Sequence, residues 1–341
     1  KLDWSLIFWI NLPLGIAALA MTWNALKLVP YHPRKHSLDY VGALLMMLAA
    51  VALLLTLSWG GRDFAWLSAP IAALLATSLV LWLLFAWRLA TAKEPFLPLA
   101  VLGNPVVRSA ALAGACSMSV LVGMTIYVPL YFEVVLHLSA GQSGIALIPM
   151  MGATVLWSTI CGRLMTFLVH YKRVPIVGII VAIASLATLA IWTSGLPTWA
   201  VLTLLFAIGS GLGTVFPIST VCMQNAVVRS QMGVATGAAN FFRALFSALV
   251  VAVLGAIVLG HSGGGAGAAV ETLAHAASAE TLATAFRYVF MAAALVLCLG
   301  MVLLLILEER PLRGPSPPSQ GAIAPSGPAT AIPEEGLSSL H

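Results

Sequence analysis

Nine long apolar segments, separated by short polar stretches, dominate the hydropathy pattern of the chain. A spanning helix needs about 20 mostly apolar residues, because its backbone groups must hydrogen-bond within the helix where lipid replaces water. The segments are continuous and rich in Leu and Ala, without the alternation of a membrane barrel strand. The pattern therefore predicts an all-α membrane protein. We place its spans at Ser5–Leu26, Leu38–Trp59, Trp66–Trp87, Val107–Phe132, Ser143–Leu164, Val174–Thr193, Pro197–Val221, Val234–Leu259 and Tyr288–Leu307.

The composition agrees with a membrane location. Of 341 residues, 61% are hydrophobic and only 8% are charged, whereas soluble domains carry about 25% charged residues. A short turn, Gly60 to Ala65, joins the second and third segments into a predicted hairpin, and six further segments follow the linker Lys93 to Pro105 as a predicted bundle. Beyond Arg310, Pro, Ser, Gly and Ala dominate without a periodic apolar face, which predicts a disordered cytoplasmic tail.

The basic residues indicate how the chain crosses the membrane. If the C-terminus is cytoplasmic, twelve of them lie in inner loops, three lie outside, and Arg243 lies within the membrane. This is the positive-inside bias, and it accounts for the net charge of +5 without nucleic-acid binding. The inner ones are Lys27, Arg34, Lys35, Arg88, Lys93, Arg108, Arg163, Lys172, Arg173, Arg229, Arg310 and Arg313; the outer ones are Lys1, Arg62 and Arg287.

The beginning of the chain resembles neither a translation start nor a signal peptide. Its first residue is Lys rather than Met, and no basic region precedes a short apolar stretch. Counting the predicted spans back from a cytoplasmic C-terminus places Lys1 outside the membrane. We therefore expect further helices to precede Lys1, and we expect Lys1 and the loop from His261 to Thr284 to lie on one side, opposite the tail.

No motif for catalysis or for binding of a metal or cofactor is found. The four cysteines, Cys116, Cys161, Cys222 and Cys298, are dispersed without a CxxC pair, and the histidines lie in loops or the tail. The glycine run 263–267 lacks the Lys-Ser/Thr and the strand of a phosphate loop, so a flexible linker is the simpler interpretation. We expect no enzyme activity, no metal and no cofactor.

Arg243 is the leading candidate for a functional residue. It lies about ten residues into the eighth predicted span, which is roughly 15 Å along the helix and near the bilayer midplane. Asn240 lies one turn earlier, and Gly233, Gly237, Asn240 and Ala244 form a stripe of small or polar residues that predicts close helix contact. Arg243 then either faces the substrate path or holds the bundle together through helix-end carbonyls.

Proton coupling would need a carboxylate or histidine that titrates inside the membrane. Glu133 is the one acidic residue near a helix core, because the others lie at the termini, in loops or at a helix start. It follows Tyr127, Pro129 and Tyr131 at the end of the fourth span. We interpret Glu133 as a solvated interfacial carboxylate, and as a proton carrier only in the alternative.

The seventh span contains glycines and a proline that predict close helix contact or bending. They are Gly209, Gly211, Gly213 and Pro217, and Gln224 and Asn225 follow at the inner end. Tight packing and a hydrated helix end are the simpler interpretation. The alternative is that Gln224 and Asn225, with Asn240, Arg243 and Tyr127, line the substrate path.

Several short motifs, in order, resemble fourteen-helix drug exporters of the EmrB/QacA type in the major facilitator superfamily. Their sixth helix resembles Phe8–Gly15 here, and their most recognisable C-terminal stretch resembles Gly233–Arg243. The resemblance spans roughly Trp4 to Arg310. The other matching stretches are Leu38–Gly42, Glu94–Pro98, Tyr127–Phe132, Gln142–Gly144 and Gln224–Ala226.

The resemblance implies two six-helix bundles around a central cavity, with two further helices between them. Residues 1–27 would be the last helix of the N-terminal bundle, 28–92 the inserted hairpin, 93–310 the C-terminal bundle and 311–341 the tail. Gly162, Arg163, Lys172 and Arg173 match a weak copy of the family's inner-loop gating motif, but its acidic residue is missing. The family's antiporter motif and membrane acidic residues belong to five helices that this sequence does not contain.

The resemblance further implies proton-driven efflux of hydrophobic or cationic small molecules across a bacterial cytoplasmic membrane by the complete protein. The partners would then be the lipid bilayer, the substrate and protons. The alternatives are a truncated remnant that does not transport, or an exporter of one specific metabolite. By itself, this polypeptide is expected not to perform proton-coupled export.

Overall fold

The computed structural model describes residues 9, 11–27, 39–61, 63–92, 103–165, 167, 171–228, 231–261 and 279–308. They belong to two units, residues 1–39 and 40–341. In the first unit, α2 (Asn11–Leu26) has Pro13 in its first turn, where the missing N–H of proline costs nothing. The rest of the first predicted span, and the tail after residue 308, lie outside the described residues.

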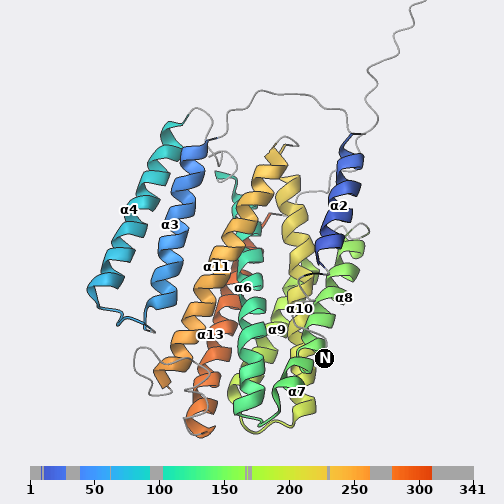
Figure 1. The fold of residues 1–341 in the computed structure, drawn as a ribbon. Helices are drawn as coiled ribbons and strands as arrows, with labels where there is room; N and C mark the ends of the chain where they lie inside the picture. Colours follow the sequence, from blue (N-terminus) through green and yellow to red (C-terminus); the bar gives the residue numbers. More distant parts are fainter. Residues whose placement is uncertain are drawn as a thin grey trace, which may run out of the picture. The chain divides into compact units, whose positions relative to one another are not determined.

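In the second unit, the predicted hairpin is formed by α3 (Tyr40–Trp59) and α4 (Ala69–Thr91), which lie side by side in Figure 1. Small buried residues of α3, such as Ala49 and Ala52, let the two helices approach closely. The Ser78 hydroxyl donates a hydrogen bond to the Ala49 carbonyl at 3.0 Å. The hairpin packs on α11 (Met232–His261) through a small cluster of apolar residues, Met46, Phe85, Leu89 and Ala238, with Trp82 and Phe241 beside it.

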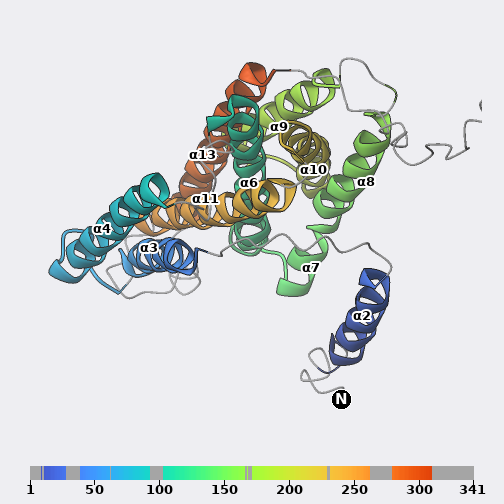
Figure 2. The same ribbon diagram turned by 90° about the horizontal axis from the view of Figure 1, so that it is seen from above.

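The remaining helices form one bundle, with its largest core around α6 and α10. Figure 2 shows α10 between α8 and α9, and α6 next to α11 and α13. Asn104 caps α6, and its amide also donates to the Ala226 carbonyl at the end of α10 at 3.0 Å. The helices are α6 (Pro105–Val134), α7 (Ala140–Ile145), α8 (Ile148–Leu164), α9 (Arg173–Ile191), α10 (Thr198–Asn225), α11 (Met232–His261) and α13 (Ala279–Ile306).

Within the described ranges, eight helical stretches are long and apolar enough to span a membrane, and they correspond to the second to ninth predicted spans. This confirms the predicted all-α membrane fold. The predicted span Ser143–Leu164 is divided at Ala146 and Leu147. A capping box of Ser139 and Gln142 starts α7, and α8 begins at Ile148 with Pro149 in its first turn. The prediction for the last span was nine residues too short, since α13 already begins at Ala279.

An aromatic cluster closes one end of the bundle. Tyr131 lies 5.4 Å from both Phe286 and Phe290, measured between ring centroids, and its hydroxyl donates to the Thr193 carbonyl. These contacts join the end of α6 to α13 and to the residues after α9. Such edge-to-face aromatic pairs add stability beyond the area that they bury.

Candidate functional site

Arg243 lies in the apolar interior of α11, and its side chain is directed at α10. Its Nη2 donates to the Ser219 hydroxyl at 3.1 Å and to the Thr220 hydroxyl at 3.3 Å. Its Nη1 reaches the Asn240 side-chain oxygen at 3.4 Å. All three partners are neutral, so the hydrogen bonds hold the guanidinium in place without cancelling its charge.

The guanidinium fits between the helices because α6 has a glycine opposite it. A Cβ at Gly114 would lie 2.9 Å from the Ser219 hydroxyl and 3.0 Å from Arg243 Nη2. The third nitrogen, Nε, is buried and has no hydrogen-bond partner in the described part of the chain. A buried donor without an acceptor is costly, so the described side chains leave one hydrogen-bond donor of the guanidinium unsatisfied.

The face of α11 around Arg243 is open on one side. Asn240 is exposed, and a Cβ at Gly233 or Gly237 would have no neighbour within 4 Å in the described chain. The described residues supply no helix contact at these two glycines, so their predicted role in close helix contact stays a prediction. They leave a smooth, uncovered strip on α11, because the hairpin and α6 contact its other sides.

The glycines of α10 lie against the backbones of the two neighbouring helices. A Cβ at Gly209 would lie 2.1 Å from the Met150 carbonyl oxygen of α8, and one at Gly213 would lie 2.5 Å from that of Thr154. A Cβ at Gly211 would lie 2.1 Å from the Gly178 carbonyl oxygen of α9. Alternate glycines thus bring the backbone of α10 into contact with both neighbours.

Pro217 and the last residues of α10 make looser contacts than the glycines of that helix. Pro217 lies inside α10, where its missing N–H leaves the Gly213 carbonyl without its helical partner. The same proline is opposite Gly162 of α8, whose Cβ would lie 3.8 Å from the Pro217 Cβ. Gln224 and Asn225 are partly exposed at the helix end.

The four residues of the predicted gating motif have separate surroundings. Arg163 lies in the last turn of α8 and Arg173 begins α9, and both are exposed. The Lys172 ammonium donates to the carbonyl oxygens of Leu305, at 2.7 Å, and Leu307 at the end of α13. A cation at this position is favourable, because the last carbonyls of a helix carry partial negative charge.

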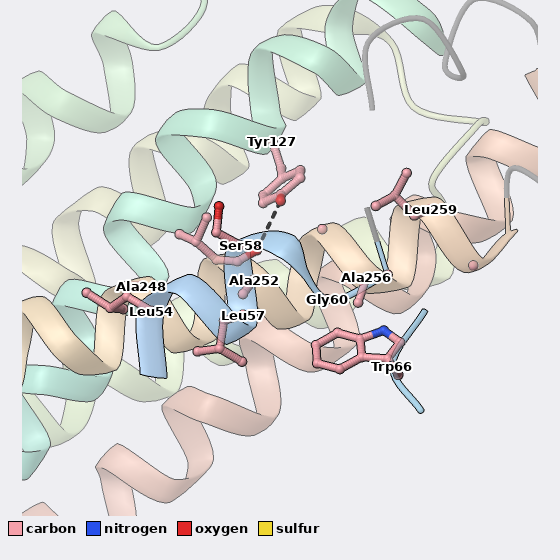
Figure 3. Close-up of a pocket in the computed structure, with 14 residues that line it drawn as sticks. Leu54, Leu57, Ser58, Gly60, Trp66, Tyr127, Ala248, Ala252, Ala256 and Leu259 are labelled. Carbon is pink, nitrogen blue, oxygen red and sulfur yellow. Dashed lines mark hydrogen bonds between the residues drawn. The ribbon is translucent and has the colours of Figure 1, made fainter. Parts of the chain in front are cut away.

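Tyr127 is separate from the Arg243 site. Its hydroxyl donates to the Val251 carbonyl at 3.0 Å, eight residues after Arg243 on α11 and so about 12 Å further along the helix. Here α3, the turn that follows it, α6 and α11 line an open cavity of about 610 Å³ (Figure 3). This cavity was not predicted, because its walls come from three distant segments and consist mostly of small or apolar residues.

Glu133 is partly exposed, one residue before the end of α6. Among the described residues, no group of three His, Cys, Asp or Glu side chains could hold a metal ion. Cys116, Cys161 and Cys222 are buried and Cys298 is half-buried, each as a free thiol. The role of Glu133 stays a prediction.

The helices and their composition define a multi-pass membrane protein. The Major Facilitator Superfamily matches residues 1–251, so the chain belongs to this family of transporters, which is not a family of enzymes. Similar proteins include the multidrug transporter protein MdtP of Bacillus subtilis, 32% identical over 266 residues, which are 77% of this chain and 48% of MdtP.

Two further relatives show how broad the similarity is. The uncharacterized MFS-type transporter Rv1877 of Mycobacterium tuberculosis is 30% identical over 338 residues, covering 91% of this chain and 48% of the relative. The aspyridones efflux protein of the fungus Neocamarosporium betae is 26% identical over 265 residues, covering 74% of this chain and 47% of the relative. The chain spans about half the length of the curated relatives it matches.

Proposed function

We propose that this chain supplies the C-terminal bundle, the inserted hairpin and the last N-terminal-bundle helix of a proton-driven exporter of small hydrophobic or cationic molecules. The observation that carries the proposal is the open face of α11, where Arg243 and Asn240 place polar groups within an otherwise apolar helix. Polar groups within a span are costly and mark substrate paths or gates. Relatives named as multidrug transporter and efflux protein support export as the direction.

The open face suits a second bundle. Transporters of this kind expose a midplane site alternately to each side by moving one bundle against the other. Gly233 and Gly237 allow a facing helix to approach α11 closely, whereas Arg243 and Asn240 offer hydrogen bonds at the midpoint. A second bundle would thus cover the strip that the described residues leave open.

A second candidate is export of an anionic metabolite. Arg243 is held by neutral side chains and has one unsatisfied N–H, so it would attract a carboxylate or phosphate and repel a cation. Cationic substrates would need a carboxylate from helices outside this sequence. The charge of the transported molecule therefore separates the two candidates.

The test is an efflux assay with a two-bundle fusion, in which the helices of MdtP that precede its region of similarity are joined to this chain. We expect everted vesicles containing the fusion to move ethidium only when a pH gradient is imposed. The chain without the added helices should be inactive. A fusion that folds by size-exclusion chromatography but moves anionic dyes instead supports the second candidate, and one that moves neither contradicts the proposal.

Arg243→Met tests whether the polar face is functional. We expect transport by the fusion to fall at least about tenfold, equivalent to about 1.4 kcal/mol. The chain should keep its thermal stability, because removing a guanidinium from hydrocarbon relieves about 2.5 kcal/mol or more and offsets three hydrogen bonds. Arg243→Lys, which keeps the charge, is the matched control. Equal losses of stability and transport would instead assign Arg243 a structural role.

A further inference from the structure

The cavity between the hairpin and the bundle is formed by small residues on one side of α11. Ala248, Ala252, Gly255 and Ala256 follow the i, i+4, i+7, i+8 spacing of a single helix face. A larger side chain at any of them would fill the space. Position 255 requires glycine, because a Cβ there would lie 2.7 Å from the Tyr127 hydroxyl oxygen. The small residues of α11 thus leave the cavity open and make room for the Tyr127 hydroxyl.

Two aromatic side chains line this space, and each is held in place. Tyr127 from α6 is anchored by its hydrogen bond to the Val251 carbonyl. Trp66 lies against the turn Gly60–Gly61, where a Cβ on Gly60 would be 2.7 Å from the indole ring and one on Gly61 would be 2.6 Å from the indole nitrogen. Gly61 also has a φ of 76°, which favours glycine. Figure 3 shows the Tyr127 and Trp66 rings on either side of the labelled α11 residues.

The polar groups of the cavity are few and neutral. Its described lining residues include the hydroxyls of Tyr127 and Ser58 and the indole N–H of Trp66, and they include no charged side chain. Because the Tyr127 hydroxyl donates to Val251, its oxygen remains able to accept a hydrogen bond. Among the described lining residues an ion would find only neutral polar groups, and exchanging hydration for these is unfavourable.

We propose that this cavity is a binding site for a neutral aromatic molecule, separate from the Arg243 face. Its volume of about 610 Å³ lies within the range of about 300–1,000 Å³ typical of small-molecule sites. Aromatic walls favour an aromatic ligand through offset or edge-to-face contacts. Trp59, Phe64 and Trp66 at the same end of the hairpin are half-exposed, as aromatic residues at a membrane surface are, so the ligand enters from the interfacial layer of the bilayer.

Photolabelling of the purified chain in lipid nanodiscs tests this site without any transport assay. The probe is benzophenone, which is neutral and aromatic and has one carbonyl acceptor. We expect its adducts to concentrate on peptides from residues 54–66 and 248–260. A cationic probe with the same core, (4-benzoylbenzyl)trimethylammonium, should not label these peptides. Equal labelling by the two probes would overturn the assignment to neutral molecules.

Two pairs of variants test the position of the ligand. Ala252→Trp should fill the cavity and abolish the adducts, whereas Val253→Trp places the same bulk on an exposed position next to it. Trp66→Leu removes one aromatic wall and should weaken labelling, whereas Trp59→Leu removes a similarly exposed tryptophan outside the lining. The second pair changes only surface residues, so it remains informative if Ala252→Trp fails to fold.

Labelling that is spread over lipid-facing residues such as Leu295, or that survives both Ala252→Trp and Trp66→Leu, would overturn the proposal. A phospholipid with a diazirine on its acyl chain serves as the competing occupant. If this lipid labels the cavity peptides and benzophenone does not displace it, the site holds a lipid chain and not an aromatic ligand. Displacement of the lipid by benzophenone is the expected result.

Discussion

The two glycine-containing helices α10 and α11 differ in what their glycines contact. In α10, Gly209, Gly211 and Gly213 meet the backbones of α8 and α9 so closely that no Cβ fits. In α11, Gly233 and Gly237 face open space in the described chain, on the side that carries Asn240. The same residue type therefore gives a closed side of the bundle, where α10 packs on α8 and α9, and an open side on α11, where the described chain places no neighbour.

The largest expected effect concerns the closed side. Gly211→Ala places a methyl group 2.1 Å from the Gly178 carbonyl oxygen, and backbone cannot yield as a side chain can, so we expect a loss of about 3 kcal/mol. Gly237→Ala, on the open side, should stabilise α11 by up to about 1 kcal/mol through helix propensity. Thermal unfolding of the chain in detergent measures both. Equal destabilisation by the two variants would remove the distinction between the two sides.

The sequence predicted where the helices run but not which way their faces point. Length and apolarity locate a span, so the second to ninth spans were predicted to within a few residues at most ends. A lipid-facing side and a protein-facing side are both apolar, however, so hydropathy could not tell that Gly211 is buried and Gly237 is open. The division at Ala146 and Leu147 was missed for a similar reason, because α7 and α8 together are as apolar as one span.

The candidate site was predictable only in part. Arg243 stood out because a cation within a span is rare, and Asn240, one turn away, does contact it. Ser219, Thr220 and Gly114 were not predicted as neighbours of Arg243, because hydroxyls and glycines are common in spans and carry no charge signal. Their role depends on which helices meet at that level, and the local sequence does not contain that information.

A smaller change in stability is expected for a substitution at Gly114, which lies on α6 opposite Arg243. Gly114→Ala would put a methyl group 3.0 Å from Arg243 Nη2 and 2.9 Å from the Ser219 hydroxyl. Both are ends of flexible side chains, so the guanidinium moves and stability changes by less than about 1 kcal/mol. We expect transport by the two-bundle fusion to fall several-fold.

Gly123→Ala on the same helix is the control for Gly114→Ala. Its methyl group would lie 2.8 Å from the Leu254 Cδ1 atom, so the crowding is similar but involves no polar group. The comparison is made by measuring initial efflux rates at matched expression. A loss of transport in both variants would show that α6 is sensitive to bulk in general, and the position of the guanidinium would then not be the cause.

The hydrogen bonds from Lys172, at the start of α9, to the end of α13 should contribute still less to stability. Lys172→Met removes the ammonium from the Leu305 and Leu307 carbonyls, and a cation at a helix C-terminus contributes about 0.3–1 kcal/mol. Arg173→Met removes the next cation along the chain, which is exposed in the first turn of α9 and opposes its dipole. We expect the unfolding midpoint to fall for Lys172→Met and to stay level or rise slightly for Arg173→Met. The reverse order would show that the hydrogen bonds to α13 contribute no stability.

The smallest effect is expected at Glu133, the acidic residue closest to a helix core. It lies one residue before the end of α6 and is partly exposed, so its carboxylate can reach water. A negative charge at a helix C-terminus is unfavourable, and Glu133→Gln should therefore stabilise the chain by about 0.3 kcal/mol or leave it unchanged. If the open face of α11 is the moving interface, Glu133 takes no part in proton coupling, and the pH dependence of ethidium efflux by the two-bundle fusion should be the same in Glu133→Gln. A profile that becomes flat in this variant would extend the functional face to the end of α6 and would make Glu133 the proton carrier.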